Sequence, residues 1–226
     1  MLLFPKMLDN FLFIAPKLLL ILIFLLHQIP LEVSFLSQLS SLSLASNAIT
    51  GTIPEDLFAN TNLKELSLSM NSLTGPLPLS VGLATSLRAL NLGFNNLEGS
   101  IPSQLFQLVN LEEFSLEANT RVVGGLDGLG NLSSLTSFSI GSTSIKSRIP
   151  SEIESLTMLR VLKLENSFLS GAIPVEVAKL TNLNHLDLSN SNFRQALPTV
   201  LGQLQSLSKS ILNVCGYLGQ CDLLIC

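Results

Sequence analysis

The stretch Leu87-Arg-Ala-Leu-Asn-Leu-Gly-Phe-Asn-Asn-Leu-Glu-Gly-Ser-Ile-Pro102 decides the fold, because its frame LxxLxLxxNxLxGxIP recurs along the chain. Leucine opens this frame at eight positions that lie 24 residues apart: Leu39, Leu63, Leu87, Leu111, Leu135, Leu159, Leu183 and Leu207. A fixed period of this length is typical of a solenoid, in which each unit packs only against its neighbours. The 226 residues therefore predict a row of stacked units with one continuous core.

Each unit contains one short strand. Apolar and polar residues alternate around Leu66 and Leu68, which indicates a strand with one buried face. The two inward positions recur as two apolar files: Leu42, Leu66, Leu90, Phe114, Phe138, Leu162 and Leu186, and Leu44, Leu68, Leu92, Leu116, Ile140, Leu164, Leu188 and Leu212. Because stacked units pair such strands in parallel, we expect one sheet on the concave side.

Polar and conformationally restricted residues mark the rest of each unit. Asn47, Asn71, Asn95 and Asn119 follow the strands, where an amide can both donate to and accept from the backbone. A proline such as Pro102 then predicts a short helical or 3-10 segment on the convex side. The expected fold is of the α/β class, a right-handed solenoid of about eight 24-residue repeats with its parallel sheet on the concave face.

The composition argues against nucleic acid and against a metal or cofactor. Charged residues make up 12% of the chain and the net charge is -4, so there is no basic surface of the kind that binds phosphates. His27 and His185 lie far apart in the sequence, and all three cysteines lie near the C-terminus. This spacing does not fit a metal site, and we expect no cofactor.

Residues 1–34 differ from the remainder of the chain. Lys6 and Lys17 precede the apolar run from Leu18 to Leu26, a pattern typical of a signal peptide or signal-anchor. Membrane contact through residues 11–26 is therefore among the expected interactions. Two alternatives stay open: an artefact of the gene model, or a degenerate opening repeat, since Ile29-Pro30 lies 24 residues before Ile53-Pro54.

The phrases Asn71-Ser-Leu-Thr-Gly75 and Ser167-Phe-Leu-Ser-Gly-Ala-Ile-Pro174 resemble the plant-specific class of leucine-rich repeat. Such repeats form the ectodomains of plant receptor-like proteins and receptor kinases, and also polygalacturonase-inhibiting proteins. The resemblance covers about residues 36–212. It implies recognition of peptides, proteins or other extracellular molecules on the concave surface or its flanks, with no chemistry in the repeats.

The chain departs from this family's pattern at its ends. Plant ectodomains of this class usually carry a cysteine-paired cap before the first repeat, whereas the first cysteine here is Cys215. The sequence after the array also contains no kinase motif set. We expect a short relative, an isoform or a fragment. We divide the chain into an apolar leader (1–34), a leucine-rich-repeat domain (35–214) and a degenerate tail (215–226).

The fourth repeat and the tail are irregular. Residues Arg121, Val123, Gly125 and Leu126 stand where the frame has Leu, Gly, Ile and Pro, which predicts altered curvature or a softer joint near residues 119–131. This segment is interpreted either as a specificity loop, with Arg121 and Asp127 as binding candidates, or as drift in a tolerant loop. Cys215 is expected as a buried thiol while Cys221 and Cys226 pair, or the tail is disordered.

The outward positions of the strands are the candidate binding residues, because only they can contact a partner. They are Glu65, Met70, Asn91, Phe94, Glu113, Glu117, Lys163, Glu165, His185 and Asp187. Met70 and Phe94 are the only large apolar groups in the middle of this face and form a candidate anchor. The sequence specifies no nucleophile near His185 and Asp187, so we expect no enzyme activity.

These observations predict a non-catalytic module that recognises a protein or peptide ligand, with a co-receptor as a further candidate partner. The leader favours a secreted or plasma-membrane location, in which case the sequon Asn131-Leu-Ser133 is a glycosylation candidate. The expected role of this recognition module is in signalling or defence-type perception. Two alternative hypotheses are an intracellular scaffold and a fragment of a larger receptor.

Overall fold

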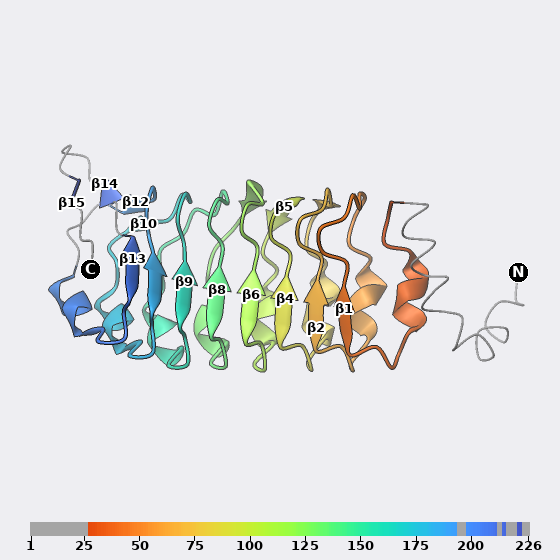
Figure 1. Cartoon of the computed structure of the whole chain (residues 1–226), viewed down its shortest axis with the longest axis horizontal. Coiled ribbons are helices and arrows are strands. Elements are labelled where there is room, and N and C mark those ends of the chain that lie inside the picture. Colours follow the sequence, from red (N-terminus) through yellow and green to blue (C-terminus); the bar gives the residue numbers. More distant parts are fainter. Residues whose placement is uncertain (1–26, 194–197, 212–213, 216–220, 223–226) are drawn as a thin grey trace, which may run out of the picture.

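Eight short strands form one parallel sheet along the molecule, as shown in Figure 1. The computed structural model describes residues 27–193, 198–211, 214–215 and 221–222. The strands are β1 (Ser41–Ser43), β2 (Glu65–Ser67), β4 (Ala89–Asn91), β6 (Glu113–Ser115), β8 (Ser137–Ser139), β9 (Val161–Lys163), β11 (His185–Asp187) and β13 (Lys209–Ile211). Leu66 lies opposite Leu90, and Leu90 opposite Phe114, so the register equals the repeat period. The predicted solenoid sheet is confirmed.

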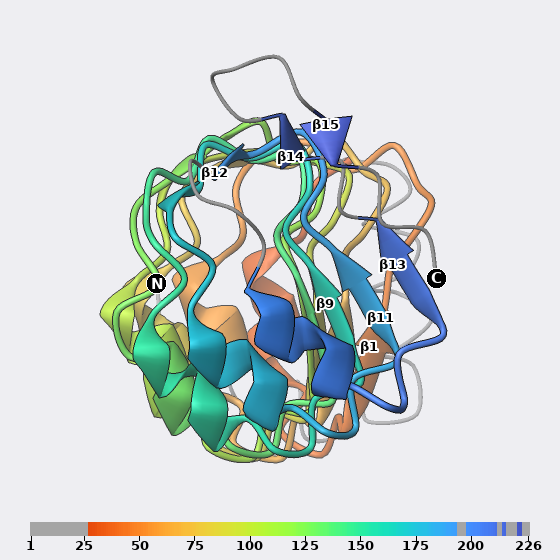
Figure 2. The same cartoon turned by 90° about the vertical axis from the view of Figure 1, so that its left-hand side faces the viewer.

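Eight 3-10 helices lie on the other side of the described chain, as Figure 2 shows along the stack. They are η1 (Leu31–Phe35), η2 (Glu55–Ala59), η3 (Leu79–Leu83), η4 (Ser103–Gln107), η5 (Leu129–Asn131), η6 (Ser151–Ser155), η7 (Val175–Lys179) and η8 (Thr199–Gln203). A proline precedes all of them except η5, and its extended backbone, for example φ -69° at Pro102, starts the turn. These helices have five residues or fewer, and such short segments commonly take the tighter 3-10 form.

Further strands pair outside the main sheet. One group contains β3 (Thr74–Gly75), β5 (Asn96–Ser100) and β7 (Arg121–Val123), and a second contains β10 (Ser170–Gly171) and β12 (Asn192–Phe193). Near the C-terminus, β14 (Val214–Cys215) pairs antiparallel with β15 (Cys221–Asp222). This pairing sets the backbones of Cys215 and Cys221 opposite each other, whereas the predicted partner Cys226 lies outside the described residues.

A single apolar core runs through the whole stack, from Ile29 to Leu204. The central residue of each main-sheet strand from β2 to β11 is buried in it, and Leu42 of β1 packs against it. Leu92 and Leu116 are 0% and 1% exposed, and the rings of Phe114 and Phe138 stack with centroids 5.8 Å apart. No repeat could bury these side chains alone, so the neighbouring repeats stabilise each other through shared apolar contacts.

A ladder of buried asparagines satisfies the backbone where the strands end. The Nδ2 group of Asn119 donates to the carbonyls of Leu116 and Leu92, at 2.9 and 3.0 Å, and its Oδ1 atom accepts from the Leu97 N–H at 3.0 Å. Asn95 makes the equivalent bonds one repeat earlier. Each amide therefore joins its own repeat to the preceding one, as the sequence predicted.

Hydroxyl side chains continue this column with fewer bonds. Thr143 donates to the Ile140 carbonyl at 2.8 Å, and Ser167 donates to the Leu164 carbonyl at 2.7 Å. The hydroxyl of Ser191 reaches the Leu164 carbonyl of the preceding repeat at 3.0 Å. A hydroxyl has one proton where an amide has two, so these repeats are joined less completely.

The residue before this polar column has a left-handed backbone in each repeat from the first to the seventh, which the sequence did not reveal. Met70 and Phe94 have φ values of 56° and 57°, and the same conformation recurs at Ser46, Ala118, Ser142, Asn166 and Asn190. None of them is glycine, so each conformation costs about 1–3 kcal/mol. Bonds between repeats compensate, for example that from the Met70 N–H to the Gly93 carbonyl at 2.9 Å.

The folded array begins before the boundary predicted at residue 34. Ile29 and Val33 are buried in the core, and Val33 lies 24 residues before the buried Leu57. Gln28 also forms a parallel bridge with Thr50. The predicted boundary therefore cuts through η1, and residues 27–35 are the second half of a repeat.

The targeting segment and its membrane contact, residues 11–26, lie outside the described residues. None of the helices described here has the length and apolar character needed to cross a bilayer.

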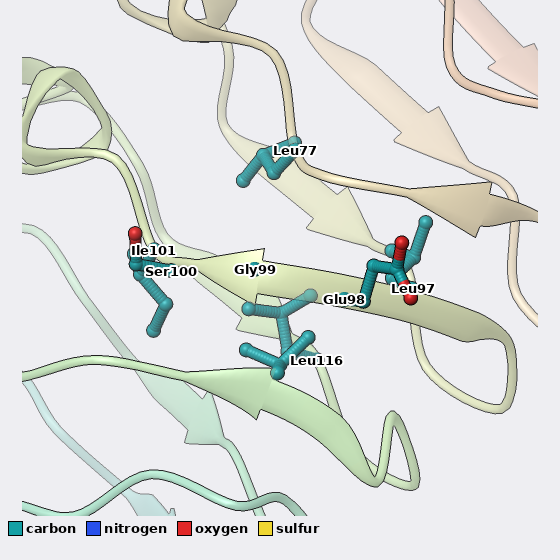
Figure 3. A pocket seen from close by; sticks show the side chains of 8 residues that line it. Leu77, Leu97, Glu98, Gly99, Ser100, Ile101 and Leu116 are labelled. Carbon is teal, nitrogen blue, oxygen red and sulfur yellow. The ribbon is translucent and has the colours of Figure 1, made fainter.

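The irregular fourth repeat keeps the main sheet intact. Phe138 of β8 still lies opposite Phe114 of β6. Figure 3 shows the side chains around β5. Leu97, Leu116 and Val122 of β7 line a recess there, and this recess has no room for water. Gly128, with φ 95°, takes the N-cap position before a shortened η5, a position that proline has in the other repeats. The departure from the frame is thus confined to the second half of the repeat.

Replacing Asn119 with alanine should destabilise the protein by about 2–4 kcal/mol, because it leaves a buried N–H and several carbonyls without partners. The matched control is Asn47→Ala in the same column. Asn47 is exposed and donates only within its own repeat, to the carbonyls of Leu44 and Ala45. Urea denaturation followed by circular dichroism measures both, and equal midpoints would contradict the ladder as a source of stability.

Candidate functional site

The solvent-facing side of the eight-stranded sheet, called the sheet face below, contains a hollow of about 220 Å³. It corresponds to the predicted concave side. The hollow crosses four neighbouring strands, β4, β6, β8 and β9, and is lined by Ala89, Leu90, Asn91, Glu113, Phe114, Ser115, Glu117, Ser137, Ser139, Val161 and Lys163. Four of the ten predicted face residues, Asn91, Glu113, Glu117 and Lys163, line it, and the other six lie outside the lining.

Small outward side chains create this hollow. Ala89 and Ser137 lie in one outward row of β4, β6 and β8, and Ser115 and Ser139 lie in the next row, where longer side chains would fill the space. Serine hydroxyls can donate and accept hydrogen bonds. The floor of the hollow is therefore short and polar, while Asn91, Glu113, Glu117 and Lys163 contribute the longer side chains of its lining.

An ion pair crosses the hollow. The Lys163 ammonium lies 3.7 Å from Glu117 Oε2, and the Ser139 hydroxyl donates to the same oxygen at 3.0 Å. Since β8 lies between β6 and β9, the Lys163 side chain spans the width of β8 to reach Glu117. Both side chains are partly exposed, so the pair contributes little to stability.

Glu165 lies beside this ion pair in an unfavourable environment for an ionised carboxylate. Burial raises the pKa of its carboxyl group, and the charges of Asp187 and Glu117 raise it further, against the lowering effects of its backbone hydrogen bond and Lys163. Its Oε2 atom is buried without a hydrogen-bond partner. The carboxylate occupies the space above Gly141, where a Cβ atom would lie 2.4 Å from Oε1. Any side chain at Gly141 would displace it.

His185 and Asp187 do not form an acid–base pair. Ser189 donates to Asp187 Oδ1 from its backbone N–H at 3.1 Å and from its hydroxyl at 2.7 Å, so this carboxylate holds the local chain. Burial lowers the pKa of His185, as do Lys209 and Lys163, while Asp187 raises it. The described residues also contain no group of three or more His, Cys, Asp and Glu that could hold a metal ion.

The predicted apolar anchor is separate from the hollow. Met70 and Phe94 are 54% and 47% exposed, and they occupy the left-handed positions that follow β2 and β4. The Ser46 hydroxyl lies 3.3 Å from Met70 Sδ. Glu65, on β2, accepts a hydrogen bond from Ser41 and also lies outside the lining. Met70 and Phe94 therefore lie on the rim of the sheet face, where the strands end, and not in the hollow.

The irregular-loop candidates lie away from the sheet face. Arg121 belongs to β7, where its guanidinium lies 3.3 Å from Glu98 Oε2 and donates to the Asn96 carbonyl at 3.2 Å. Asp127 is exposed in the loop before η5, and Asn131 is exposed at the end of that helix. The structure does not bring these residues together with the hollow.

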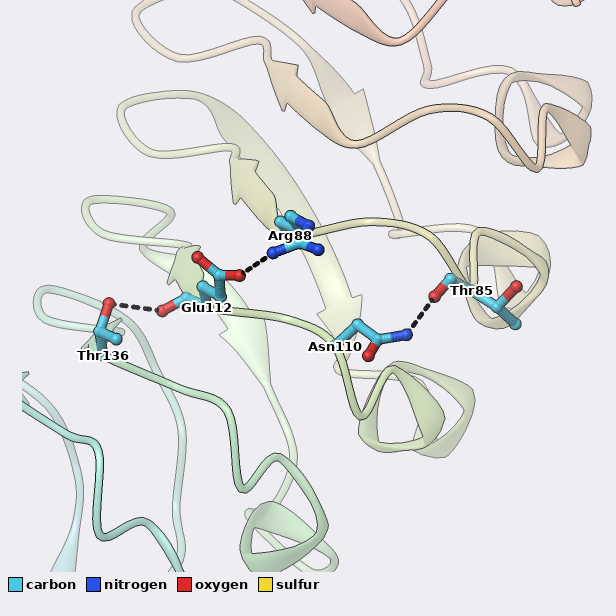
Figure 4. Close-up of polar contacts among 5 residues, drawn as sticks. All are labelled: Thr85, Arg88, Asn110, Glu112 and Thr136. Carbon is cyan, nitrogen blue, oxygen red and sulfur yellow. Dashed lines mark hydrogen bonds and ion pairs between the residues drawn. The ribbon is translucent and has the colours of Figure 1, made fainter.

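A further cation is held where the strands begin. Figure 4 shows Arg88 paired with Glu112, at 2.5 Å, while the Thr136 hydroxyl donates to the Glu112 carbonyl. Asn110 donates in the same region to the Thr85 carbonyl of the preceding repeat. These contacts join repeats along the edge of the sheet and keep Arg88 out of the hollow.

Sequence reasoning missed several residues that shape the site, namely Ala89, Ser137, Ser139, Gly141 and Val161. The outward positions that were predicted have mostly long or charged side chains. The available signal was the run of small residues at outward positions of successive repeats, because a hollow on a sheet forms where side chains are short.

Replacing Glu165 with glutamine should raise the melting temperature at pH 7. A carboxyl whose folded pKa is raised favours the folded state only below its ordinary pKa, and this contribution disappears as the pH rises through the folded pKa. Ionised Glu165 therefore opposes folding at neutral pH, whereas glutamine carries no charge. The gain should shrink towards about pH 4. Thermal melts at both pH values test this, with Glu152→Gln on η6 as control. A gain that grows on acidification would contradict the assignment.

Comparisons with known proteins agree with this architecture. The family model described as Leucine Rich Repeat matches residues 38–60, 62–83, 86–108 and 182–204. The ectodomain of the membrane receptor kinase GASSHO1/SCHENGEN3 from Arabidopsis thaliana is 33% identical, with a TM-score of 0.75 over 79% of this chain and 21% of that ectodomain. The ectodomain of the Arabidopsis receptor kinase HAESA is 34% identical, with a TM-score of 0.76 over 81% of this chain and 31% of that one.

The likeness is not confined to plants. A leucine-rich-repeat protein from Leptospira interrogans is 33% identical, with a TM-score of 0.70 over 81% of this chain and 45% of that one. A search among curated protein sequences gave no match. The chain spans about a fifth to a third of the length of the two plant ectodomains. Leucine-rich-repeat ectodomains are in general non-catalytic binding modules. The chain is a leucine-rich-repeat protein, similar in its repeats to plant receptor-kinase ectodomains.

Proposed function

We propose that this chain recognises an extended peptide through the hollow of the sheet face. The hollow crosses four strands, and strands in a sheet lie about 4.8 Å apart, so its width of about 14 Å matches about four extended residues. Its serine hydroxyls can bind the N–H and carbonyl groups of a peptide backbone. This hollow is the observation that carries the proposal.

The solved relatives support a peptide as ligand. The HAESA ectodomain was solved in complex with an N-terminally extended IDA peptide hormone, and the GASSHO1/SCHENGEN3 ectodomain in complex with CASPARIAN STRIP INTEGRITY FACTOR 2. A further HAESA structure contains both the peptide hormone and the co-receptor SERK1. By analogy, we propose that a co-receptor is a second partner of this chain.

We further propose that the repeats act outside the cell, in signalling or defence-type perception, as a secreted or membrane-tethered module. Lys6 and Lys17 before the apolar run favour export, and positive charges on that side favour placing the repeats beyond the membrane. Asn131 is exposed, as a glycan acceptor must be.

A bulky side chain in the hollow should weaken peptide binding without unfolding the protein. The variant is Ser137→Trp, because Ser137 lies on the central strand β8 and lines the hollow. The probe is a phage library of random dodecapeptides selected on the full-length chain, followed by affinity measurements with the recovered peptides. Binding to Ser137→Trp should weaken at least tenfold, the scale on which interface hot spots act.

Ser103→Trp is the matched control, since Ser103 is exposed at the start of η4 on the opposite side of the solenoid. Circular dichroism of both variants should match the parent. If the recovered peptides bind Ser137→Trp as well as they bind the parent, the hollow is not the recognition site and the proposal is wrong.

An exported chain should carry a glycan on Asn131. The measurement is the mass of a C-terminally tagged chain expressed in plant cells, before and after glycosidase treatment. The expected result is a mass shift that the enzyme removes and that Asn131→Gln lacks. Residence in the cytosol with Met1 retained would contradict the proposed location and favour an intracellular scaffold.

A further inference from the structure

Carboxylates outnumber cations around the hollow. Glu113 and Glu117 line it from the two ends of β6, and Glu165 lies beside it, whereas Lys163 is the only cation of the lining. Glu113 is exposed, and it has no ion-pair partner among the described side chains. The excess negative charge is therefore open to a partner.

Lys163 shows where a cation fits in this surface. Its ammonium group reaches across β8 to Glu117 Oε2, a contact between residues two repeats apart. The pair is partly exposed and its separation of 3.7 Å is longer than a direct hydrogen bond between charged groups. A cation from outside can therefore replace Lys163 at small cost.

Glu165 supplies a second acceptor beside the same place. Its Oε2 atom is buried and accepts no hydrogen bond from the described residues. Its carboxylate lies over Gly141, which stands between Glu117 and Glu165 at the 24-residue spacing. Because this atom is shielded from solvent, a ligand donor reaches it only when the Glu165 side chain rotates towards the hollow. The bond then formed removes the cost of a buried acceptor without a donor. A ligand ammonium or guanidinium group carries several such donors.

We propose that the hollow binds a lysine or arginine side chain of an extended peptide, whose cationic group displaces Lys163 from Glu117 and donates to Glu165. This inference rests on the proposed peptide recognition and specifies the chemistry of the peptide. It requires Lys163 to compete with the ligand instead of contacting it.

An anionic peptide is the opposite case. Its carboxylate could pair only with Lys163 in the lining, and it would face Glu113, Glu117 and Glu165 at the same time. Like charges across an interface oppose binding, so the surface discriminates against such a partner. The two ligand types thus predict opposite effects of removing Lys163.

The experiment uses the phage library of random dodecapeptides on the full-length chain and counts Lys plus Arg against Asp plus Glu among recovered clones. The most enriched peptide is then synthesised and its affinity measured for Lys163→Met, Glu117→Gln and Glu165→Gln. Lys64→Met and Glu152→Gln are matched controls, because both residues are exposed and lie outside the hollow.

The expected result is enrichment of Lys and Arg, binding about fivefold tighter to Lys163→Met, and binding about fivefold weaker to Glu117→Gln and Glu165→Gln, as for a partly exposed ion pair. Binding of the peptide should also weaken as salt increases.

Peptides that lose affinity for Ser137→Trp bind in the hollow. If such peptides bind Lys163→Met more weakly than the parent, or lack Lys and Arg, this inference is wrong and peptide recognition still stands. Recovery of no peptide sensitive to Ser137→Trp would overturn both.

Discussion

The burial of each repeat's apolar side against the next repeat is the interaction on which everything else depends. A 24-residue unit exposes its leucines when alone, and its strand of three residues has no partners for its backbone groups. Stacking supplies both, because the same translation that covers the leucines also aligns the strands. Once the period is fixed, each outward residue lies beside the residue 24 positions away, and a surface feature can extend over several repeats.

The asparagine ladder shows how strictly this period is enforced. Asn119 reaches back to the Leu92 carbonyl of the preceding repeat and accepts from the Leu97 N–H, so a change in repeat length would break bonds on both sides. The left-handed residues before it, including Met70 and Phe94, are held by backbone hydrogen bonds to the next repeat. In the C-terminal half, Thr143, Ser167 and Ser191 replace the amides. The hollow lies across the point where this change occurs.

The chemistry of the hollow is one that folding alone does not favour. Glu165 is half-buried near Glu117 and Asp187, and its pKa is raised mainly because burial removes water from the carboxylate. Lys163 gives partial compensation from the neighbouring outward position. A surface selected for stability would have no reason to keep a buried oxygen without a donor. The presence of this oxygen fits a site completed by a ligand.

The sequence by itself determined the solenoid, the strand positions, the inward files, the asparagine ladder and the proline-started turns, because each follows from a local pattern repeated at a fixed period. It also placed Glu113, Glu117 and Lys163 on the correct face. Only the tertiary structure decided that Met70 and Phe94 lie on the rim, that Ile29 and Val33 join the core, and that Gly141 leaves room for Glu165. Periodicity fixes the direction of a side chain from its own strand. The shape and charge of a site depend instead on the lengths of side chains from other repeats, as when Lys163 meets Glu117 across an intervening strand.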